Sequence, residues 1–508
     1  MNRHLFVPLC LALAAPASAT PRFEDRSAAL PVAQIYDGGW EHFVGGGVAV
    51  FDCNGDARPD LFAAGGENPA RLFVNRTPAG EAITFDLGNA PELTGVTGAY
   101  PLDIDSDGAL DLAVLRVGPN RLLKGDGACG FADVTAEWGL PEDDRWTTAF
   151  AATWEAGQSR PTLAFGNYVD RSRQDGPFEA CDINQLYRPE GHGYGAPLAL
   201  EPGFCALSML ISDWKREGMP DLRISNDRHY YVRGGYEQMW HLNPLAPYGE
   251  AEGWRKVSLW GMGIASRDLN GDGRPEVMLT SMGDQLLQFN DGPAGWRDAP
   301  YGIGTYAQRP FVGDDGRPST GWHAEFGDID NDGRADLFIA KGNVDQMPSN
   351  AIHDPNNLLM QKPDGSFAEM ADRAGVATMA RSRGAALADL NGDGRLDIVV
   401  MNRRAPMEVW QNVTEGTGHW LAIEPRMPGA NSRAVGAWVE MHAGDWREAQ
   451  EVTVGGGHAG GQAGPLHFGL GAADAVEVVV HWPGGGETHV SAIAVDRRIT
   501  VYPDGRVE

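Results

Sequence analysis

A short acidic phrase recurs along the chain, and its side chains have the spacing of a cation-binding loop. Clear copies begin at Asp52, Asp103, Asp268, Asp328 and Asp389. Carboxylate or amide oxygens stand at positions 1, 3, 5 and 9 of a copy, and a glycine at position 4 or 6 lets the chain turn sharply. Calcium takes about six to eight oxygen ligands, and such a loop supplies them together with the backbone carbonyl at position 7.

The predicted ligands occupy positions 1, 3, 5, 7 and 9 of each copy, and position 7 contributes only its carbonyl oxygen. They are Asp52, Asn54, Asp56, Arg58, Asp60, Asp103, Asp105, Asp107, Ala109, Asp111, Asp268, Asn270, Asp272, Arg274, Glu276, Asp328, Asp330, Asp332, Arg334, Asp336, Asp389, Asn391, Asp393, Arg395 and Asp397. Unlike an EF-hand, the copy at Asp328 has no glutamate at position 12 and runs into the apolar strand 337–340.

Two simpler interpretations of these loops compete with calcium. Asp, Asn and Gly also form ordinary hairpin turns. However, several carboxylates within nine residues repel one another without a cation, and the arrangement occurs five times. Magnesium usually keeps several waters in a smaller octahedral shell, so calcium is favoured. Because no copy stands beside a marked general base, we expect about five calcium ions with a structural role.

The acidic phrase belongs to a longer internal repeat. Two weaker copies, near Thr153 and from Asp213, fill the gap between the second and third clear copies. The copy near Thr153 has lost nearly every oxygen ligand, and the copy from Asp213 keeps only Asp213, Glu217 and Asp221 in register, so we expect neither to bind calcium tightly. Every unit also contains a short apolar phrase typical of a strand, so the fold survives where the metal chemistry does not. Units of this size cannot bury both faces of their own sheet, whereas seven arranged radially can. The sequence therefore predicts an all-β, seven-bladed β-propeller.

The remaining composition supports this organisation. With 67 glycines and 33 prolines the chain suits many short strands and turns rather than helices. We expect the propeller over residues 20–415 and a small β-domain over 416–508, with strands near 419–423, 435–441, 475–482 and 498–502. The glycine-rich segment 455–464 between them predicts a loop; a phosphate cradle is the alternative, but the segment lacks the P-loop lysine and a following helix.

The N-terminus and the charge predict where the protein works. Residues 1–19 combine a basic start, an apolar run and a small-residue cleavage site, which is typical of a secretory signal peptide. We expect a periplasmic or extracellular protein. The formal net charge of −28 argues against nucleic acid and anionic membranes as partners. No segment approaches the roughly 20 apolar residues of a membrane span. We expect a monomer that binds an unknown protein or polysaccharide.

The cysteines fit an oxidising compartment. Cys53, Cys129, Cys181 and Cys205 remain after cleavage, an even number. Cys181 and Cys205 are the favoured disulfide because both lie in one loop-rich insert, although buried thiols are the alternative. Cys53 lies within a predicted calcium loop, and since calcium does not bind sulfur we expect it to be a bystander.

The repeats resemble FG-GAP (VCBS-type) repeats, as found in the heads of integrin α chains. The tail phrases beginning at Gly418, Gly455 and Ala475 resemble the ASPIC/UnbV domain of bacterial proteins similar to cartilage acidic protein. The resemblance covers about residues 45–502. It implies an extracellular calcium-binding or adhesive protein and assigns no reaction.

An enzymatic function, such as polysaccharide lyase activity at the central channel, is the alternative. His229, His323 and His353 each stand near an acidic or tyrosine side chain that could support general-base chemistry. His42, His323 and His353 could also form a transition-metal site if the fold brought them together. Catalysis requires His229 or His323 to contact a carboxylate inside the central cavity. Because histidines more often satisfy buried hydrogen bonds, we favour a binding protein and assign no catalytic residue.

Overall fold

The structure is a computed structural model and is almost entirely β. It describes residues 19–173, 180–227, 234–292, 295–306 and 317–508. The predicted signal peptide therefore lies outside the described residues, apart from Ala19. Helix is confined, within those ranges, to α1 (Ala371–Ala374) and the short 3₁₀ turns η1 (Ser27–Ala29), η2 (Trp40–His42), η4 (Glu250–Glu252) and η6 (Tyr301–Ile303). None of these is long and apolar enough to cross a membrane.

The repeat units form small antiparallel sheets, and the described residues contain seven of them. The first four sheets are β2 (Val48–Phe51), β3 (Asp60–Ala63), β4 (Arg71–Asn75) and β5 (Phe85–Leu87); β6 (Val96–Leu102), β7 (Asp111–Arg116), β8 (Arg121–Gly125) and β9 (Phe131–Asp133); β10 (Thr147–Thr153), β11 (Thr162–Asn167), β12 (Asn184–Tyr187) and β15 (Leu198–Leu200); and β16 (Ala206–Ser212), β17 (Asp221–Asn226), β18 (Gln238–His241) and β19 (Ala246–Pro247).

In the other three sheets the strands again follow chain order, except that the fourth strand of the last sheet is β1 from the N-terminus. They are β20 (Gly261–Arg267), β21 (Glu276–Ser281), β22 (Leu286–Asn290) and β23 (Trp296–Asp298); β24 (Gly321–Gly327), β25 (Asp336–Lys341), β26 (Asn357–Gln361) and β27 (Phe367–Glu369); and β28 (Arg381–Ala388), β29 (Asp397–Arg403), β30 (Glu408–Asn412) and β1 (Phe23–Asp25). A two-stranded hairpin, β13 (Pro189–Glu190) with β14 (Gly193–Tyr194), extends from the third unit.

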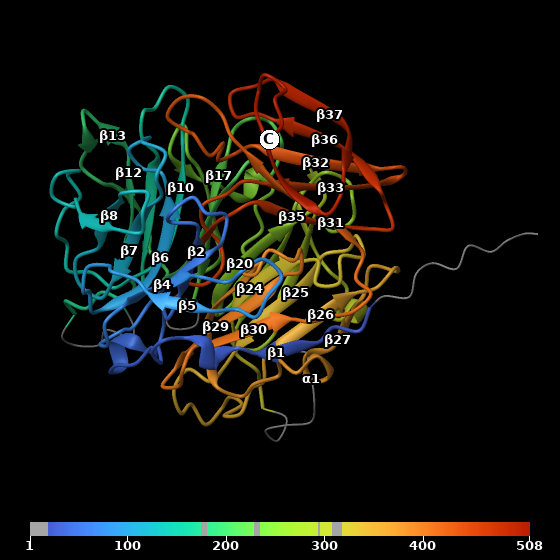
Figure 1. Cartoon of the computed structure of the whole chain (residues 1–508). Helices are drawn as coiled ribbons and strands as arrows, with labels where there is room; N and C mark the ends of the chain where they lie inside the picture. Colours follow the sequence, from blue (N-terminus) through green and yellow to red (C-terminus); the bar gives the residue numbers. More distant parts are fainter. Residues whose placement is uncertain (1–18, 174–179, 228–233, 293–294, 307–316) are drawn as a thin grey trace, which may run out of the picture.

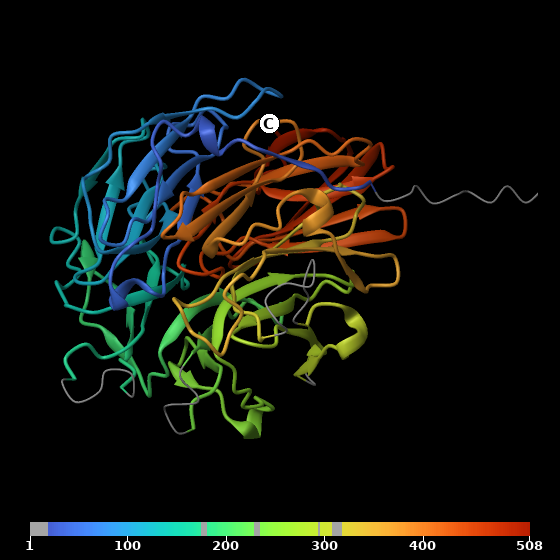
Figure 2. The same cartoon turned by 90° about the horizontal axis from the view of Figure 1, so that it is seen from below.

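The sheets close into a ring, which is the arrangement of a β-propeller. The first strands of successive sheets contact one another, and β28 of the last sheet contacts β2 of the first. The ring is also closed by strand pairing, because β1 from the N-terminus completes the last sheet by pairing with β30, Phe23 opposite Asn412. Figure 2 shows β1, in blue, lying along the orange strands of that sheet. The repeat pattern, which starts after β1, gives no sign of this closure.

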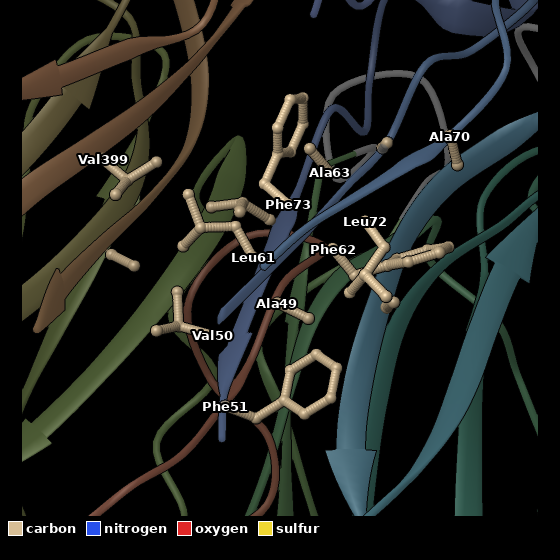
Figure 3. Close-up of a cluster of buried hydrophobic side chains, with 14 of the residues drawn as sticks. Ala49, Val50, Phe51, Leu61, Phe62, Ala63, Ala70, Leu72, Phe73 and Val399 are labelled. Carbon is tan, nitrogen blue, oxygen red and sulfur yellow. The ribbon is translucent and has the colours of Figure 1, made fainter. Parts of the chain in front are cut away.

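The core lies between adjacent sheets. Successive residues of a strand face opposite sides of its sheet, so each sheet packs against both neighbours. In the first sheet, Leu61 and Phe62 of β3 are both buried and point to opposite sides, Leu61 towards Val399 of β29 (Figure 3). The same cluster reaches Leu112 of the second sheet. This continuous packing explains why the strand phrases of the weaker repeat units persist.

The C-terminal residues form a separate pair of sheets. One contains β31 (His419–Pro425), β35 (Leu466–Gly471) and β38 (Arg497–Val501), and the other β32 (Trp438–Ala443), β33 (Trp446–Glu451), β36 (Ala475–His481) and β37 (Glu487–Ala494). The strands expected near 419–423, 475–482 and 498–502 are present, whereas β33, β35 and β37 were not expected. Figure 1 shows this domain, in red, lying over the propeller.

The glycine-rich segment after β33 enters the centre of the ring, and we call residues 453–464 the plug. It contains β34 (Gln462–Ala463), which pairs in parallel with β2. Hydrogen bonds join the plug to the first strands of six sheets: Ala152 N to Val454 O, Gly456 N to Met209 O, Gly457 N to Ile264 O, His458 N to His323 Nδ1, Gly461 N to Ala99 O and Val50 N to Gly461 O. The segment is a loop as predicted, but its amides are committed to the propeller, which argues against the phosphate cradle.

Glycine is required in the plug because backbone meets backbone there. A Cβ atom added to Gly460 would lie 2.3 Å from the carbonyl oxygen of Val48, well inside van der Waals contact. The strands that face the plug have the same constraint, since a Cβ at Gly98 would lie 1.6 Å from the carbonyl oxygen of Ala459. The glycine content of this segment therefore reflects burial in a narrow channel.

The described residues contain two disulfides, one of which the sequence favoured and one of which it did not predict. Cys181 is joined to Cys205, the pair that the sequence favours. Cys53 is joined to Cys129 of the neighbouring β8–β9 hairpin, a pairing that the sequence did not predict. This disulfide ties an acidic loop to the next sheet, and the expectation that the Cys53 sulfur is not a calcium ligand stays a prediction.

A matched pair of glycine substitutions tests the plug. We expect Gly460→Ala to lower the free energy of unfolding by about 1 to 3 kcal/mol, because the new methyl group overpacks the channel. Gly464→Ala in the same segment serves as the control, since a Cβ there meets nothing within 4 Å and the backbone needs no positive φ. Chemical denaturation measures both. Equal stability of the two variants contradicts a tightly packed plug.

Candidate metal centres

The five acidic loops occupy equivalent places in the fold. Each connects the first strand of a sheet to the second, and position 9 is the first residue of that second strand, as in Asp60 of β3 and Asp336 of β25. Because the sheets are arranged in a ring, the loops lie on one face of the propeller. The C-terminal domain covers this face. Residues far apart in the sequence thus form a circle of similar acidic sites.

The position 1 carboxylate folds each loop around itself. One of its oxygens accepts a hydrogen bond from the position 6 amide: the donors are Ala57, Gly108, Gly273, Gly333 and Gly394, at 2.7 to 3.2 Å. Position 6 has positive φ in all five loops, which favours glycine. Ala57 adopts φ of 68° despite its side chain. The glycine at position 6 of the other four loops is therefore explained by backbone geometry.

The position 9 carboxylate has a structural role that the sequence did not reveal. In the loop of β25, Asp336 Oδ2 accepts from the amide of Ile329 at 2.9 Å, and Oδ1 accepts from the amide of Gln361 at 2.8 Å. Asp60, Asp111 and Asp397 make the same two kinds of bond. Position 9 therefore anchors its loop to the end of the third strand, whether or not it also binds a cation.

Positions 5 and 7 are linked directly. The position 7 amide donates to the position 5 carboxylate in all five loops, at 2.9 or 3.0 Å. The position 7 arginine side chain also pairs with that carboxylate in three loops: Arg58 with Asp56, Arg334 with Asp332 and Arg395 with Asp393. In the loop 103–111, Lys124 of β8 pairs with both Asp105 and Asp107. These cations offset part of the loop charge.

Two loops bring their carboxylates together most closely. One oxygen each from Asp103, Asp105 and Asp111 lie within 4.8 Å of one another, as do oxygens of Asp328, Asp330 and Asp332. In the other three loops position 3 is an asparagine. Asp103 is 2% exposed, and its buried Oδ1 atom has no hydrogen-bond partner. A set of oxygens alone, with an unsatisfied buried oxygen among them, fits a hard cation such as calcium.

The electrostatics point the same way. Burial raises the pKa of Asp328 well above its usual range, and the negative charges of Asp332 and Asp330 raise it further. Burial raises the pKa of Asp60 and Asp111 to about 7 and that of Glu276 to about 8, with neighbouring carboxylates adding to the effect. Charged carboxylates are thus costly in these loops without a compensating cation.

The two weaker loops have replaced the acidic pattern with neutralising contacts. In the loop from Asp213, the amide of Gly218 still donates to Asp213 Oδ2 at 2.7 Å, so the turn is kept. Arg216 now occupies position 4 and pairs with Glu440 of the C-terminal domain. In the loop near Thr153, Arg188 pairs with Glu155 at 2.7 Å. Arginine or lysine side chains also pair with clear loops, so these contacts do not decide the matter, and weak calcium binding by the two loops stays a prediction.

The described histidine candidates do not come together in one cluster. His323 Nε2 lies 3.2 Å from Glu325, so the contact required for catalysis is present. However, His323 Nδ1 accepts from the amide of His458 at 3.1 Å, which leaves Nε2 to donate to Glu325. Both ring nitrogens are committed, so His323 has no free basic atom. His42 and His353 join neither His323 nor each other in any ligand cluster within the described residues, and His229 lies outside them.

A cavity of about 1510 Å³ lies between the C-terminal domain and the loop face of the propeller. The acidic loops contribute Asp52, Asp103 and Asp268 to its wall, and the C-terminal domain contributes Trp420 and a cluster of arginines. Three of these, Arg426, Arg433 and Arg498, pair with the single carboxylate of Glu424 at 2.7 to 2.9 Å. The cavity runs around the plug and is bounded by both parts of the chain.

Comparison with known proteins agrees with the two parts of the fold. Residues 52–114 and 268–339 match the FG-GAP-like repeat, and residues 427–507 match the domain described as ASPIC and UnbV. The first matched segment contains two acidic loops, 52–60 and 103–111, and the second contains 268–276 and 328–336. The chain thus carries FG-GAP-like repeats followed by an ASPIC/UnbV domain, as the sequence resemblance indicated.

Curated relatives include human and mouse cartilage acidic protein 1, which are 25% and 26% identical over 234 residues. That match spans 44% of this chain and about a third of each relative, 33% and 34%. Solved structures with a similar outline are BBS1N in complex with ARL6DN (8% identity, TM-score 0.46, covering 78% of this chain and 98% of that one) and an Agrocybe aegerita lectin (14%, 0.39, 78% and 94%).

The raised pKa values predict how pH affects stability. A carboxyl group whose pKa is higher in the folded state binds a proton more readily there, so stability falls as pH rises from its unfolded pKa through its folded pKa. With a calcium chelator, we therefore expect the melting temperature to fall between about pH 5 and pH 8, where Asp60, Asp111 and Glu276 titrate. Saturating calcium should suppress the fall. A chelated protein whose melting temperature does not change over this range contradicts the assignment.

Proposed function

We propose that this chain, in which an FG-GAP-like β-propeller carries an ASPIC/UnbV domain, is a calcium-binding module of the periplasm or extracellular space. The observation that supports it best is the set of five loops built alike from oxygen donors, with the buried oxygen of Asp103 left unsatisfied. Residues at positions 1, 3 and 5 and the position 7 carbonyl would hold each ion. Bound calcium supplies charge compensation in the buried loops.

The calcium ions have a structural role in this proposal. Extracellular calcium modules often have dissociation constants near 10⁻⁴ to 10⁻³ M, so millimolar calcium stabilises the folded state by about 0.5 to 1.5 kcal/mol per site. Five such sites, spread around the ring, stiffen the whole face on which the C-terminal domain rests. The two disulfides suit an oxidising compartment and support a location outside the cytoplasm.

The binding partner is proposed to be a protein or a polysaccharide. The acidic-loop face is occupied by the C-terminal domain, whereas the opposite face carries the connections between second and third strands. One of these connections contains Cys181, which is joined to Cys205 just before β16. Trp40, on the connection into β2, is 43% exposed. Exposed aromatic rings contact sugar rings and protein partners alike.

The enzymatic alternative is less well supported. His323 and Glu325 line the cavity around the plug, but both ring nitrogens of His323 are hydrogen-bonded. This arrangement favours a binding role over a reaction at His323.

Metal analysis of the mature protein tests the proposal. We expect about five calcium ions per chain and a melting temperature that falls on chelation. Asp272→Asn, at position 5 of the third clear loop, should lower the count by one. Glu217→Gln, at position 5 of the weaker loop from Asp213, is the matched control and should leave the count unchanged. Absence of calcium from the wild-type protein sinks the proposal.

A further inference from the structure

The C-terminal domain binds directly to the backbone of the loop 328–336. The amide of Gly418 donates to the carbonyl of Asp330 at 2.9 Å, and the amide of Gly471 donates to the carbonyl of Asn331 at 2.8 Å. The Trp446 Nε1 atom donates to the carbonyl of Gly333, also at 2.8 Å. These acceptors lie between or beside the predicted ligands of one ion.

The other acidic loops also contact the C-terminal domain. Three of them do so through one or two hydrogen bonds. The contacts are Arg498 Nη1 to the Ala57 carbonyl at 3.2 Å, Ser432 Oγ to Asp103 Oδ2 at 2.6 Å, Ser106 Oγ to the Ala430 carbonyl at 2.9 Å, and Arg447 Nε to the Gly271 carbonyl. In the loop 389–397, Trp420 lies so close that a Cβ at Gly394 would meet its Nε1 at 1.9 Å. The domain therefore rests on all five loops.

These contacts depend on the conformation of the loops. The carbonyls of Asp330 and Asn331 point to the C-terminal domain only while the loop keeps its turn, in which Asn331 adopts φ of 56°. An ion held by Asp328, Asp330 and Asp332 fixes the backbone on both sides of Asn331. Without the ion, the crowded carboxylates repel one another and favour other arrangements of the same turn. The donors of the C-terminal domain then lose their acceptors.

The weaker loop from Asp213 provides a contrast within the same interface. Glu451 of the C-terminal domain accepts from the amide of Asp213 at 2.8 Å and from the hydroxyl of Ser212 at 2.5 Å, and Arg216 pairs with Glu440. In this loop, which lacks an oxygen ligand at position 3, the C-terminal domain supplies two carboxylates, and one of them forms an ion pair with a loop arginine. This contact is held by charges of the protein and needs no bound cation.

We propose that calcium controls the docking of the C-terminal domain on the propeller: loops that hold the ion, above all 328–336, keep the domain and its plug in place, and loss of the ion releases them. The inference rests on the proposed calcium binding and goes beyond it, since an ion can stabilise a loop without holding a neighbouring domain. Release opens the cavity between the two parts, so calcium concentration sets access to its walls.

Two matched variants test this coupling by hydrogen exchange of the full mature chain, with calcium content measured in parallel. Asp332→Asn removes the negative charge of the position 5 ligand of the loop 328–336, and Asp56→Asn removes that of its equivalent in the loop 52–60. Each position pairs with the arginine two residues on, so each variant loses the same ion pair. The loop 52–60, however, meets the C-terminal domain through the one Arg498 contact given above.

We expect each variant to lose one calcium ion. In Asp332→Asn the amides of Gly456 and Gly461 in the plug, which do not touch the altered loop, should exchange at least about tenfold faster, while amides of β7 stay protected. Asp56→Asn should leave the plug amides as in the wild type.

The outcomes separate the inference from the proposed function. If Asp332→Asn loses calcium and only the amides of Gly418 and Gly471 change, the effect is local to the loop and the coupling is wrong. Equal acceleration of the plug amides in both variants also overturns it, because calcium then acts on overall stability. A wild-type protein without calcium overturns the proposed function as well.

Discussion

Each acidic loop depends on a carboxylate buried at the start of the second strand of its sheet. Asp336 shows the constraint: its two oxygens hold the amide that opens its own loop and the amide that ends the third strand. The carboxylate therefore fixes the position of the loop relative to the end of the third strand. It also adds a negative charge to a buried place that already contains Asp328 and Asp330. Loop geometry and the proposed role of a cation thus arise from the same residue.

The C-terminal domain makes the ring of loops into an interface. Its plug passes through the channel on a backbone of glycines, because only a residue without Cβ fits against the carbonyl of Val48. Its outer part rests on the loops themselves, through donors such as the Gly418 amide and Ser432. The propeller and the C-terminal domain consequently share one set of contacts rather than meeting at a hinge between independent bodies.

Much of this architecture could be predicted from the sequence, because the acidic phrase and the strand phrase repeat in register with the sheets. The positions of Asp52 to Asp60 along one loop, and the pairing of Cys181 with Cys205, follow from local spacing. The closure of the last sheet by Phe23–Asp25, the Cys53–Cys129 disulfide and the plug could not be predicted, since each joins segments distant in sequence. The double hydrogen bonding of the position 9 carboxylates also escaped prediction, because acidity at that position suggests a ligand before an anchor.

The central claim is that the acidic loops bind calcium at the positions given by their side chains. The most direct measurement is the anomalous difference density of crystals of the mature protein grown with calcium. The account predicts a peak within about 2.3 to 2.6 Å of the oxygens in each of the loops 52–60, 103–111, 268–276, 328–336 and 389–397, and none in the loops near Thr153 and Asp213. Crystals without peaks in the five loops, or with equal peaks in the two weaker ones, would contradict it.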